Sequence, residues 1–249
     1  MKPPTRQSAR PIGAFSGPAP VWLLDLDNTL HDAMRSTFPG IKLAMGAYIE
    51  RALTLSPDEA GRLRDHYGAR YGATLLGLVR HHAIDPHDFL AGAHPLEHLP
   101  GVIRPSLRLR ASLRRLPGRR VLLTNAPAAY AARVVRLLGI TQWLDEIVTI
   151  ERMGMGGRLQ PKPSRPMFRR VVAAQRVHAS RCILVEDSLI NLRHARAVGI
   201  QGVWVTGFGR PAGGHQRSGR SMSGRRLITQ LRTFEQLPRH LHKFRVSQG

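Results

Sequence analysis

Short runs of consecutive apolar residues recur along the chain, and they alternate with segments in which apolar residues return every three or four positions. Apolar runs without polar alternation are typical of strands buried on both faces of a parallel sheet. The second pattern is typical of helices that pack one face against such a sheet. The alternation therefore predicts an α/β fold, a Rossmann-like parallel sheet with helices on both faces. The predicted strands are 21–24, 120–123, 146–150, 181–185 and 202–205, and the predicted helices are 106–116, 127–138, 164–177 and 189–198.

Residues 33–95 interrupt this alternation directly after the first strand and contain no convincing strand. Helical spacing of apolar residues covers 42–53, 57–71 and 74–82, and an Asp-Pro pair at 85–86 predicts the start of a short fourth helix. We therefore expect a small helical cap over 33–95, inserted into a core made of 21–32 and 96–206.

The two ends of the chain lack this periodicity. Residues 1–20 are rich in Pro, Gly, Ser and Ala, and we expect them to be a disordered lead-in. Residues 207–249 are rich in Gly, Ser, Arg and Pro, and we expect a basic, disordered tail. One amphipathic helix over 227–237 is compatible with this tail, either docked on the core or free.

Composition narrows the class of protein. The 249 residues carry a formal net charge of +22, but the basic residues are nearly all dispersed arginines. This distribution favours a biased composition over a nucleic-acid-binding face, although a positive field also favours phosphorylated substrates. No apolar run approaches the roughly 20 residues that span a bilayer, so we expect no membrane segment. The single cysteine, Cys182, excludes an internal disulfide and suits the cytoplasm.

Polar side chains follow several of the predicted strands. Asp25 and Asp27 follow the first strand on one face, because side chains alternate along a strand. The others are Thr124 with Asn125, Lys162, and the pair Glu186 and Asp187. Carboxyl ends of parallel strands meet at one sheet edge, where ligands bind in open α/β folds. Carboxylates, a hydroxyl and a lysine together suit phosphoryl transfer with magnesium, whereas the Asp-Asn stretch alone is also typical of a plain turn.

These residues and their order resemble the haloacid dehalogenase (HAD) superfamily over residues 21–206. The matching motifs are Asp25-Leu26-Asp27-Asn28-Thr29, Thr124-Asn125, Lys162 and Glu186-Asp187. The resemblance implies that Asp25 is a nucleophile that forms an aspartyl-phosphate and that Asp27 is the general acid and base. It implies that Thr124 binds the phosphoryl group with Asn125 behind it, and that Lys162 neutralises charge on Asp25 and the phosphate. Mg²⁺ would be held by Asp25, the backbone carbonyl of Asp27 and Asp187, with Glu186 contributing directly or through water.

The second aspartate separates two reactions within this superfamily. A halide leaves without a proton, whereas an alkoxide needs one. True dehalogenases lack the residue that corresponds to Asp27, so its presence favours phosphate-ester chemistry.

Part of the predicted cap resembles pyrimidine 5′-nucleotidases of the same superfamily. The similarity lies in 66–68 and 72–79, and also in 124–126 and 136–140 of the core. The resemblance makes Tyr67, Tyr71 and His81 candidates for substrate contact. The alternative is that the two tyrosines pack inside the cap while His81 is exposed, since aromatic residues on helices are usually packing residues.

The sequence thus predicts a Mg²⁺-dependent phosphatase acting on a small phosphorylated metabolite, with pyrimidine nucleoside 5′-monophosphates as the expected substrates. A second hypothesis is a HAD phosphatase or phosphomutase for another small phosphate ester. A third, from another class, is a basic nucleic-acid-binding protein with an incidental HAD core, which rests on charge alone. The oligomeric state is left open.

Overall fold

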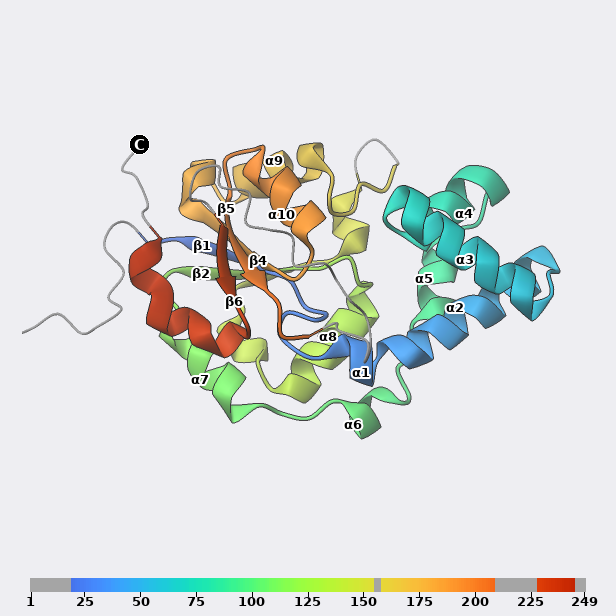
Figure 1. Cartoon of the computed structure of the whole chain (residues 1–249), viewed down its shortest axis with the longest axis horizontal. Helices are drawn as coiled ribbons and strands as arrows, with labels where there is room; N and C mark the ends of the chain where they lie inside the picture. Colours follow the sequence, from blue (N-terminus) through green and yellow to red (C-terminus); the bar gives the residue numbers. More distant parts are fainter. Residues whose placement is uncertain (1–18, 155–157, 209–227, 245–249) are drawn as a thin grey trace, which may run out of the picture.

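The computed structural model describes residues 19–154, 158–208 and 228–244, so the expectation for the lead-in lies almost entirely outside the described residues. Its centre is a parallel sheet of six strands in the order β3-β2-β1-β4-β5-β6 (Figure 1). The predicted parallel α/β fold is confirmed. The strands are β1 (Val21–Leu24), β2 (Arg119–Leu123), β3 (Glu146–Val148), β4 (Cys182–Glu186), β5 (Gln201–Val205) and β6 (Ile228–Leu231).

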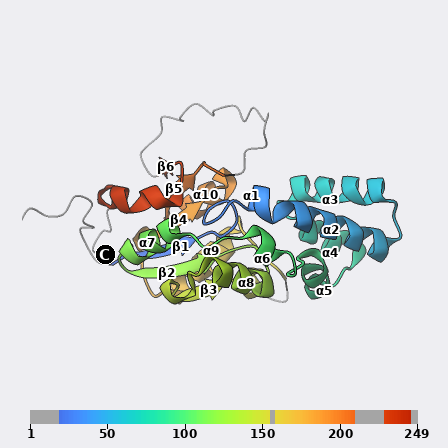
Figure 2. The ribbon, with the colours of Figure 1, turned by 90° about the horizontal axis from the view of Figure 1, so that it is seen from below.

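Helices cover both faces of this sheet because the strand residues are apolar on both sides. In β1, Trp22 and Leu24 face a cluster with α7 (Leu107–Arg115) and α8 (Ala128–Leu138), whereas Val21 and Leu23 face the opposite cluster. That second face is covered by α9 (Arg165–Ala174) and α10 (Leu189–Arg196), and Figure 1 shows the strands between this layer and the layer of α7 and α8. Figure 2 looks onto the face of the sheet, with β6 at one edge and β3 at the other. Short 3₁₀ helices are η1 (Thr141–Trp143), η2 (Ile150–Met153) and η3 (Ala179–Arg181).

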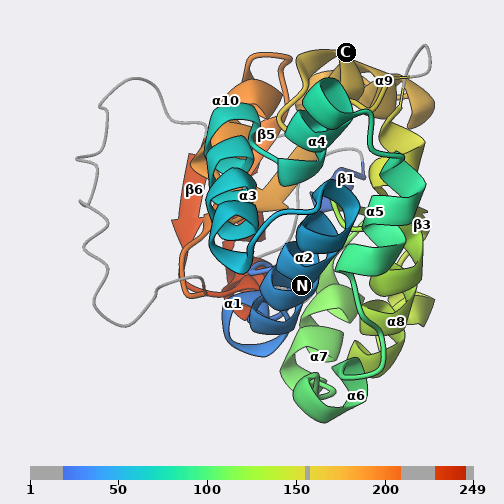
Figure 3. The same cartoon turned by 90° about the vertical axis from the view of Figure 1, so that its right-hand side faces the viewer.

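The segment after β1 forms a separate helical lobe, which we define as α2 to α5. After the short helix α1 (Ala33–Ser36), the lobe contains α2 (Phe38–Leu53), α3 (Pro57–Tyr71), α4 (Thr74–His82) and α5 (Pro86–Ala93). The chain returns to the sheet through α6 (Leu99–Val102). Figures 1 and 3 show the lobe on the side of the sheet toward which β1 runs. The helices expected over 42–53, 57–71, 74–82 and from 86 are therefore confirmed.

Local sequence signals explain where these helices begin and end. Ser56 and Glu59 form a reciprocal capping box at the start of α3. Asp85 accepts a hydrogen bond from the backbone N–H of Asp88 at the start of α5. The lobe has its own buried cluster, which includes Tyr48, Tyr67 and Phe89 and also receives Ile150 from η2.

The expectation of a disordered tail over 207–249 is wrong for residues 228–244. β6 pairs in parallel with β5, and η4 (Phe234–Lys243) follows it. Phe234, Leu237 and Leu241 are buried in the same cluster as Trp22. The segment is ordered because its apolar residues cover part of the sheet face beside α7, and their burial offsets the loss of chain entropy.

Two smaller features complete the fold. The strand predicted over 146–150 ends at Val148, because the Glu151 carboxylate accepts hydrogen bonds from the Thr149 hydroxyl and from the backbone N–H of Ala128. These bonds turn the chain toward the start of α8 instead of continuing the strand. Within the described residues, the helices are too short or too polar to cross a bilayer.

Candidate active site

Three neighbouring strands deliver the predicted site residues to one edge of the sheet. Asp25 follows β1 and its backbone N–H donates to the carbonyl of Val185 in β4, at 3.0 Å. Thr124 follows β2, and Glu186 is the last residue of β4. Because β2, β1 and β4 are adjacent in the sheet, residues far apart in sequence meet at this edge.

Lys162 is the centre of this group of charges. Its Nζ lies 2.6 Å from Asp25 Oδ1 and 2.8 Å from Glu186 Oε2. All three side chains are buried, with 3% of Lys162, 6% of Asp25 and 1% of Glu186 exposed. The Thr29 hydroxyl donates to the other oxygen of Asp25, Oδ2, at 2.9 Å. Both oxygens of Asp25 are therefore held in place.

Asn125 holds the loop that carries Lys162. Its side-chain amide donates to the carbonyl of Lys162 at 3.0 Å, and its Oδ1 accepts from the backbone N–H of Lys162 at 2.9 Å. This pair of bonds joins the end of β2 to the lysine loop. Asn125 therefore positions Lys162, while the neighbouring Thr124 hydroxyl accepts from the backbone N–H of Ala126 at 3.0 Å.

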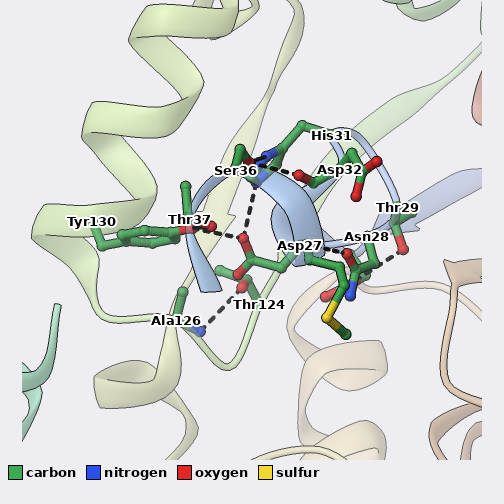
Figure 4. A network of polar contacts seen from close by, with 12 residues as sticks. Asp27, Asn28, Thr29, His31, Asp32, Ser36, Thr37, Thr124, Ala126 and Tyr130 are labelled. Carbon is green, nitrogen blue, oxygen red and sulfur yellow. Dashed lines mark hydrogen bonds and ion pairs between the residues drawn. The ribbon is translucent and has the colours of Figure 1, made fainter. Parts of the chain in front are cut away.

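Asp27 lies beside this group and has different partners. Tyr130 on α8 donates its hydroxyl to Asp27 Oδ1 at 2.8 Å, and His31 Nε2 lies 2.9 Å from the same oxygen (Figure 4). The Tyr130 hydroxyl also lies 2.8 Å from Thr37 Oγ1. Asp27 is thus held from α8 and from the loop that leads into the lobe.

Burial and mutual charge set the ionisation of the first group. Burial, together with the charge of Glu186, raises the pKa of Asp25 to about 7 despite the opposing effect of Lys162. Burial alone would lower the pKa of Lys162, but the charges of Asp25 and Glu186 outweigh it and hold that pKa above its ordinary value. Burial would raise the pKa of Glu186, but Lys162 and further hydrogen bonds hold it below the usual range.

Asp187 completes a cluster of carboxylates. Asp25, Glu186 and Asp187 each offer an oxygen, and these oxygens lie within 4.8 Å of one another. Burial and the negative charges of Asp25 and Glu186 raise the pKa of Asp187 to about 9. One ammonium group can balance only one of these three carboxylates once they ionise, and hard oxygen donors are those that Mg²⁺ prefers. The residues present therefore fit a divalent cation.

The three lobe residues predicted to contact substrate form a separate aromatic group. The Tyr67 hydroxyl lies 2.8 Å from His82 Nε2, and the Tyr71 hydroxyl lies 2.6 Å from His81 Nε2. Tyr67 is buried in the lobe core and stacks on His81, whereas His81 itself is exposed. This favours the packing alternative for Tyr67.

Sequence reasoning missed two residues of this site, His31 and Tyr130. His31 follows Asp27 by four positions, so its nearness along the chain could have drawn attention to it. Tyr130 lies 103 residues from Asp27 in sequence and reads as an ordinary apolar position of α8. The pattern along a helix does not indicate which distant loop its buried hydroxyl will meet.

The fold and the site define an α/β protein with a centre of carboxylates and a lysine at the strand ends. A model of the haloacid dehalogenase-like hydrolases matches residues 21–199. The chain therefore belongs to the family of haloacid dehalogenase-like hydrolases, and the resemblance found in the sequence is confirmed at that level.

Similar proteins include Phosphate metabolism protein 8 of Saccharomyces cerevisiae, which is 28% identical over 138 residues. That match covers 51% of this chain and 42% of the yeast protein, so the chain spans less than half of this relative. A HAD phosphatase from Thermococcus onnurineus is similar in structure, with a TM-score of 0.57, 18% identity, and coverage of 92% of this chain and 100% of that one.

Two further solved structures share the fold. One is CbbY from Rhodobacter sphaeroides in complex with phosphate, with a TM-score of 0.56, 18% identity, and coverage of 88% of this chain and 96% of that one. The other is L-2-haloacid dehalogenase from Xanthobacter autotrophicus, with a TM-score of 0.54, 14% identity, and coverage of 90% and 98%. Identities this low show the fold alone, and the reaction depends on the residues of the site.

Proposed function

We propose that this protein is a Mg²⁺-dependent phosphomonoester hydrolase that works through an aspartyl-phosphate, with pyrimidine nucleoside 5′-monophosphates as its substrates. The observation that carries the proposal is the paired arrangement of Asp25 and Asp27. Asp25 lies against a buried ammonium group at 2.6 Å, and Asp27 lies two residues further on with its own donors.

In the first step, a carboxylate oxygen of Asp25 attacks the phosphorus of the ester. The bond between phosphorus and the leaving oxygen breaks, its electron pair stays on that oxygen, and protonated Asp27 supplies the proton. Lys162 stabilises the negative charge that the phosphoryl oxygens carry, because its ammonium is buried and already oriented toward Asp25.

In the second step, Asp27 accepts a proton from water, and the resulting hydroxide attacks phosphorus. The bond between phosphorus and Asp25 breaks, which releases phosphate and restores the Asp25 carboxylate. The Thr124 oxygen already accepts from the backbone N–H of Ala126, so its own hydrogen is free to donate to a phosphoryl oxygen. Asn125 serves this chemistry indirectly, through the lysine loop that it holds.

Asp25 and Asp187, with the backbone carbonyl of Asp27, would hold Mg²⁺, which when bound supplies charge neutralisation for the phosphate. Glu186 has a different task. Its Oε2 faces Lys162 at 2.8 Å, and its Oε1 accepts from the backbone N–H of Ser188 at 3.1 Å. We therefore assign Glu186 to the orientation of Lys162 and Asp187 to direct metal binding.

Asp27 favours ester hydrolysis over dehalogenation. Loss of a halide needs no proton donor, whereas an alkoxide does. An aspartate that two side chains hold beside the nucleophile would be unnecessary for halide loss. Both dehalogenases and phosphatases share the fold, so the proton donor is what separates the two reactions.

The helical lobe is proposed to act as a cap that covers this site and selects the leaving group. Gly72, at the end of α3, neighbours the lysine loop, since an added Cβ would lie 4.0 Å from Pro163 Cδ, an ordinary contact distance. Tyr71 and His81, which are paired in this part of the lobe, are our candidates for contact with the nucleoside. The pyrimidine preference rests on the resemblance of this lobe to pyrimidine 5′-nucleotidases.

A phosphate-release screen tests the proposal. Purified protein is assayed with nucleoside monophosphates, sugar phosphates and p-nitrophenyl phosphate, with Mg²⁺ and with a chelator. We expect Mg²⁺-dependent release, fastest from UMP or CMP, and a loss of about a thousandfold or more in Asp25→Asn. Release by Asp25→Asn within about tenfold of the unchanged protein would reject the covalent mechanism. A preference for other esters would reject only the pyrimidine assignment.

A further inference from the structure

Asp27 is oriented by two side chains from different parts of the fold. Tyr130 comes from α8, which packs against the sheet, and His31 comes from the loop between β1 and α1. Both contacts fall on the same carboxylate oxygen, Oδ1, as Figure 4 shows. Oδ2 is therefore the oxygen that these contacts leave for the exchange of a proton.

The direction of the hydrogen bonds at Tyr130 follows from its chemistry. A phenol has one hydrogen, and an ionised carboxylate can only accept. Tyr130 therefore donates to Asp27 Oδ1 and accepts from the hydroxyl of Thr37, which lies 2.8 Å away. Thr37 is the residue directly before α2, so one hydroxyl joins Asp27 to the start of the helical lobe.

The Tyr130 ring is itself fixed. Its side chain is fully buried, at 0% exposed, and the His94 ring lies edge-on to it with 5.5 Å between the ring centroids. A buried tyrosine hydroxyl normally needs a partner, and here it has two. His31 is also buried, and it forms an isolated bridge with Asp27 in addition to its side-chain contact.

We propose that Tyr130 and His31 are positioning residues for the acid and base of the reaction. By holding Oδ1, they keep Oδ2 of Asp27 directed to the leaving oxygen in the first step and to water in the second. Without them, the carboxylate can rotate and present either oxygen. This inference rests on the proposed function, in which Asp27 transfers the proton.

If Tyr130 and His31 position Asp27, their loss should affect esters differently according to the leaving group, whereas a purely structural role would not. Proton donation matters for an alkoxide, which is a poor leaving group, and matters little for p-nitrophenolate, which leaves readily without a proton. Poor positioning of Asp27 should therefore lower kcat/KM, which depends on the steps up to departure of the leaving group, much more for alkyl esters than for p-nitrophenyl phosphate. A general weakening of the fold would slow both esters alike.

The experiment compares kcat/KM for two esters in Tyr130→Phe, His31→Leu and His31→Gln. The esters are p-nitrophenyl phosphate and whichever of UMP, CMP and ethyl phosphate the unchanged protein hydrolyses best. For Tyr130→Phe and His31→Leu we expect a loss of about 10- to 100-fold on the alkyl ester and less than about threefold on p-nitrophenyl phosphate. His31→Gln keeps an N–H donor and should recover part of the loss.

Tyr48→Phe is the matched control, because its hydroxyl donates to Asp88 inside the lobe, at 2.5 Å. Tyr48→Phe should leave the ratio of kcat/KM between the two esters unchanged. If Tyr130→Phe does not fold, Thr37→Val removes the bond on the other side of the same hydroxyl and should change the ratio in the same direction.

Equal losses on both esters, or no loss on either, would overturn the positioning role while hydrolysis by the unchanged protein still supports the proposed function. If the unchanged protein hydrolyses no phosphate ester, the proposed function fails and this inference fails with it.

Discussion

Lys162 is a buried ammonium group between two buried carboxylates, and breaking this pairing should destabilise the folded protein. A buried charge is tolerated only when it is paired and hydrogen-bonded, and Lys162 meets Asp25 and Glu186 within 2.8 Å. Removing the lysine alone leaves two like charges unpaired in the same place. Its catalytic role is thus tied to the stability of the site.

We predict that Lys162→Met lowers the free energy of unfolding by about 3–5 kcal/mol, the usual cost of breaking a buried pair. The double variant Lys162→Met with Glu186→Gln should recover part of this loss, because one of the unpaired charges is gone. Urea denaturation in the presence of a chelator measures both. Arg239→Ala, at an exposed position of η4, is the control and should change stability by less than about 0.5 kcal/mol. A Lys162→Met variant as stable as this control would contradict the pairing argument.

The carboxylates also predict how stability depends on pH and Mg²⁺. The pKa of Asp187 is about 9 and that of Asp25 about 7, both above the ordinary value of 3.8. A carboxyl whose pKa is raised in the folded protein contributes stability that is complete below its unfolded pKa and lost as pH rises through the folded pKa. The lowered pKa of Glu186 acts only in the acid range, so it does not oppose this loss near neutrality.

We therefore expect the metal-free protein to lose stability as pH rises from about 5 to about 9. Mg²⁺ should raise Tm more at the alkaline end, where the carboxylates are ionised and repel one another. Thermal unfolding with Mg²⁺ and with a chelator measures this. Asp187→Asn should weaken both the pH dependence and the Mg²⁺ effect. If Mg²⁺ raised the Tm of Asp187→Asn as much as that of the unchanged protein, the ion would have to bind elsewhere.

Residues near Asp27 show what the sequence can and cannot indicate at this scale. Three of the four motif positions could be found because Asp25, Thr124 and Glu186 each directly follow a predicted strand, where polar residues are unexpected unless they have a use. Lys162 lies in a loop and was found through its place in the order of the motifs. Tyr130 could not, because its helix is amphipathic and a tyrosine on the apolar face of a helix is usually a packing residue. Its hydroxyl contact depends on the crossing of α8 past the loop after β1.

At the scale of elements, close packing between helices depends on glycines of the lobe. An added Cβ on Gly77 of α4 would lie 2.2 Å from Cγ of Tyr67 on α3, so no side chain fits there. On Gly61 of α3 the nearest atom to an added Cβ is Arg64 Nη2, at 4.0 Å, so a methyl group has room. Both glycines are helical and have ordinary backbone angles.

We predict opposite effects for alanine at these two positions. Gly77→Ala should displace Tyr67 and destabilise the protein by about 1–3 kcal/mol, the usual range for overpacking. Gly61→Ala should be neutral or stabilise by up to about 1 kcal/mol through the better helix propensity of alanine. Urea denaturation of both variants measures this. If Gly77→Ala were as stable as Gly61→Ala, the close contact between α3 and α4 would be refuted.

Prediction of elements succeeded where periodicity was long and failed at the C-terminal end. Helices such as α3 and α8 carry clear spacing and end signals, so their ranges were found almost to the residue. β6 has four residues and follows a long Gly- and Arg-rich connection. A strand that short gains its stability from pairing with β5 and from burial of η4, and neither is visible in a local window.

At the scale of the whole molecule, the chemistry and the selection of substrate are separated. Asp25, Thr124 and Glu186 stand at strand ends of the sheet, and Lys162 meets two of them from a loop. The helical lobe lies beyond those strand ends (Figures 1 and 3). The alternation of apolar runs was enough to predict five of the six strands of this sheet. The contacts between lobe and sheet were not predictable, because they depend on how Ile150 and Gly72 meet residues of the other part.

This separation predicts that changes in the two parts affect different kinetic quantities. Asp27→Asn removes both the proton donor of the first step and the base that activates water in the second, so it should lower turnover of every ester. Tyr71→Phe and His81→Ala should instead alter the ratio of kcat/KM between UMP or CMP and p-nitrophenyl phosphate. Loss of one polar contact with a base is worth about 1–3 kcal/mol.

The lobe offers its own control for this test. Tyr67→Phe removes a hydroxyl that meets His82 inside the lobe, so it should lower stability and leave the substrate ratio unchanged. Tyr71 and His81 are bonded to each other, so their combined variant should show less than the sum of the single effects. The ratio is measured for each folded variant with the same preparation of Mg²⁺ buffer. A ratio that stays flat in Tyr71→Phe, His81→Ala and their combination would make the pair a packing feature, and the pyrimidine assignment would lose its basis even if phosphate-ester hydrolysis stands.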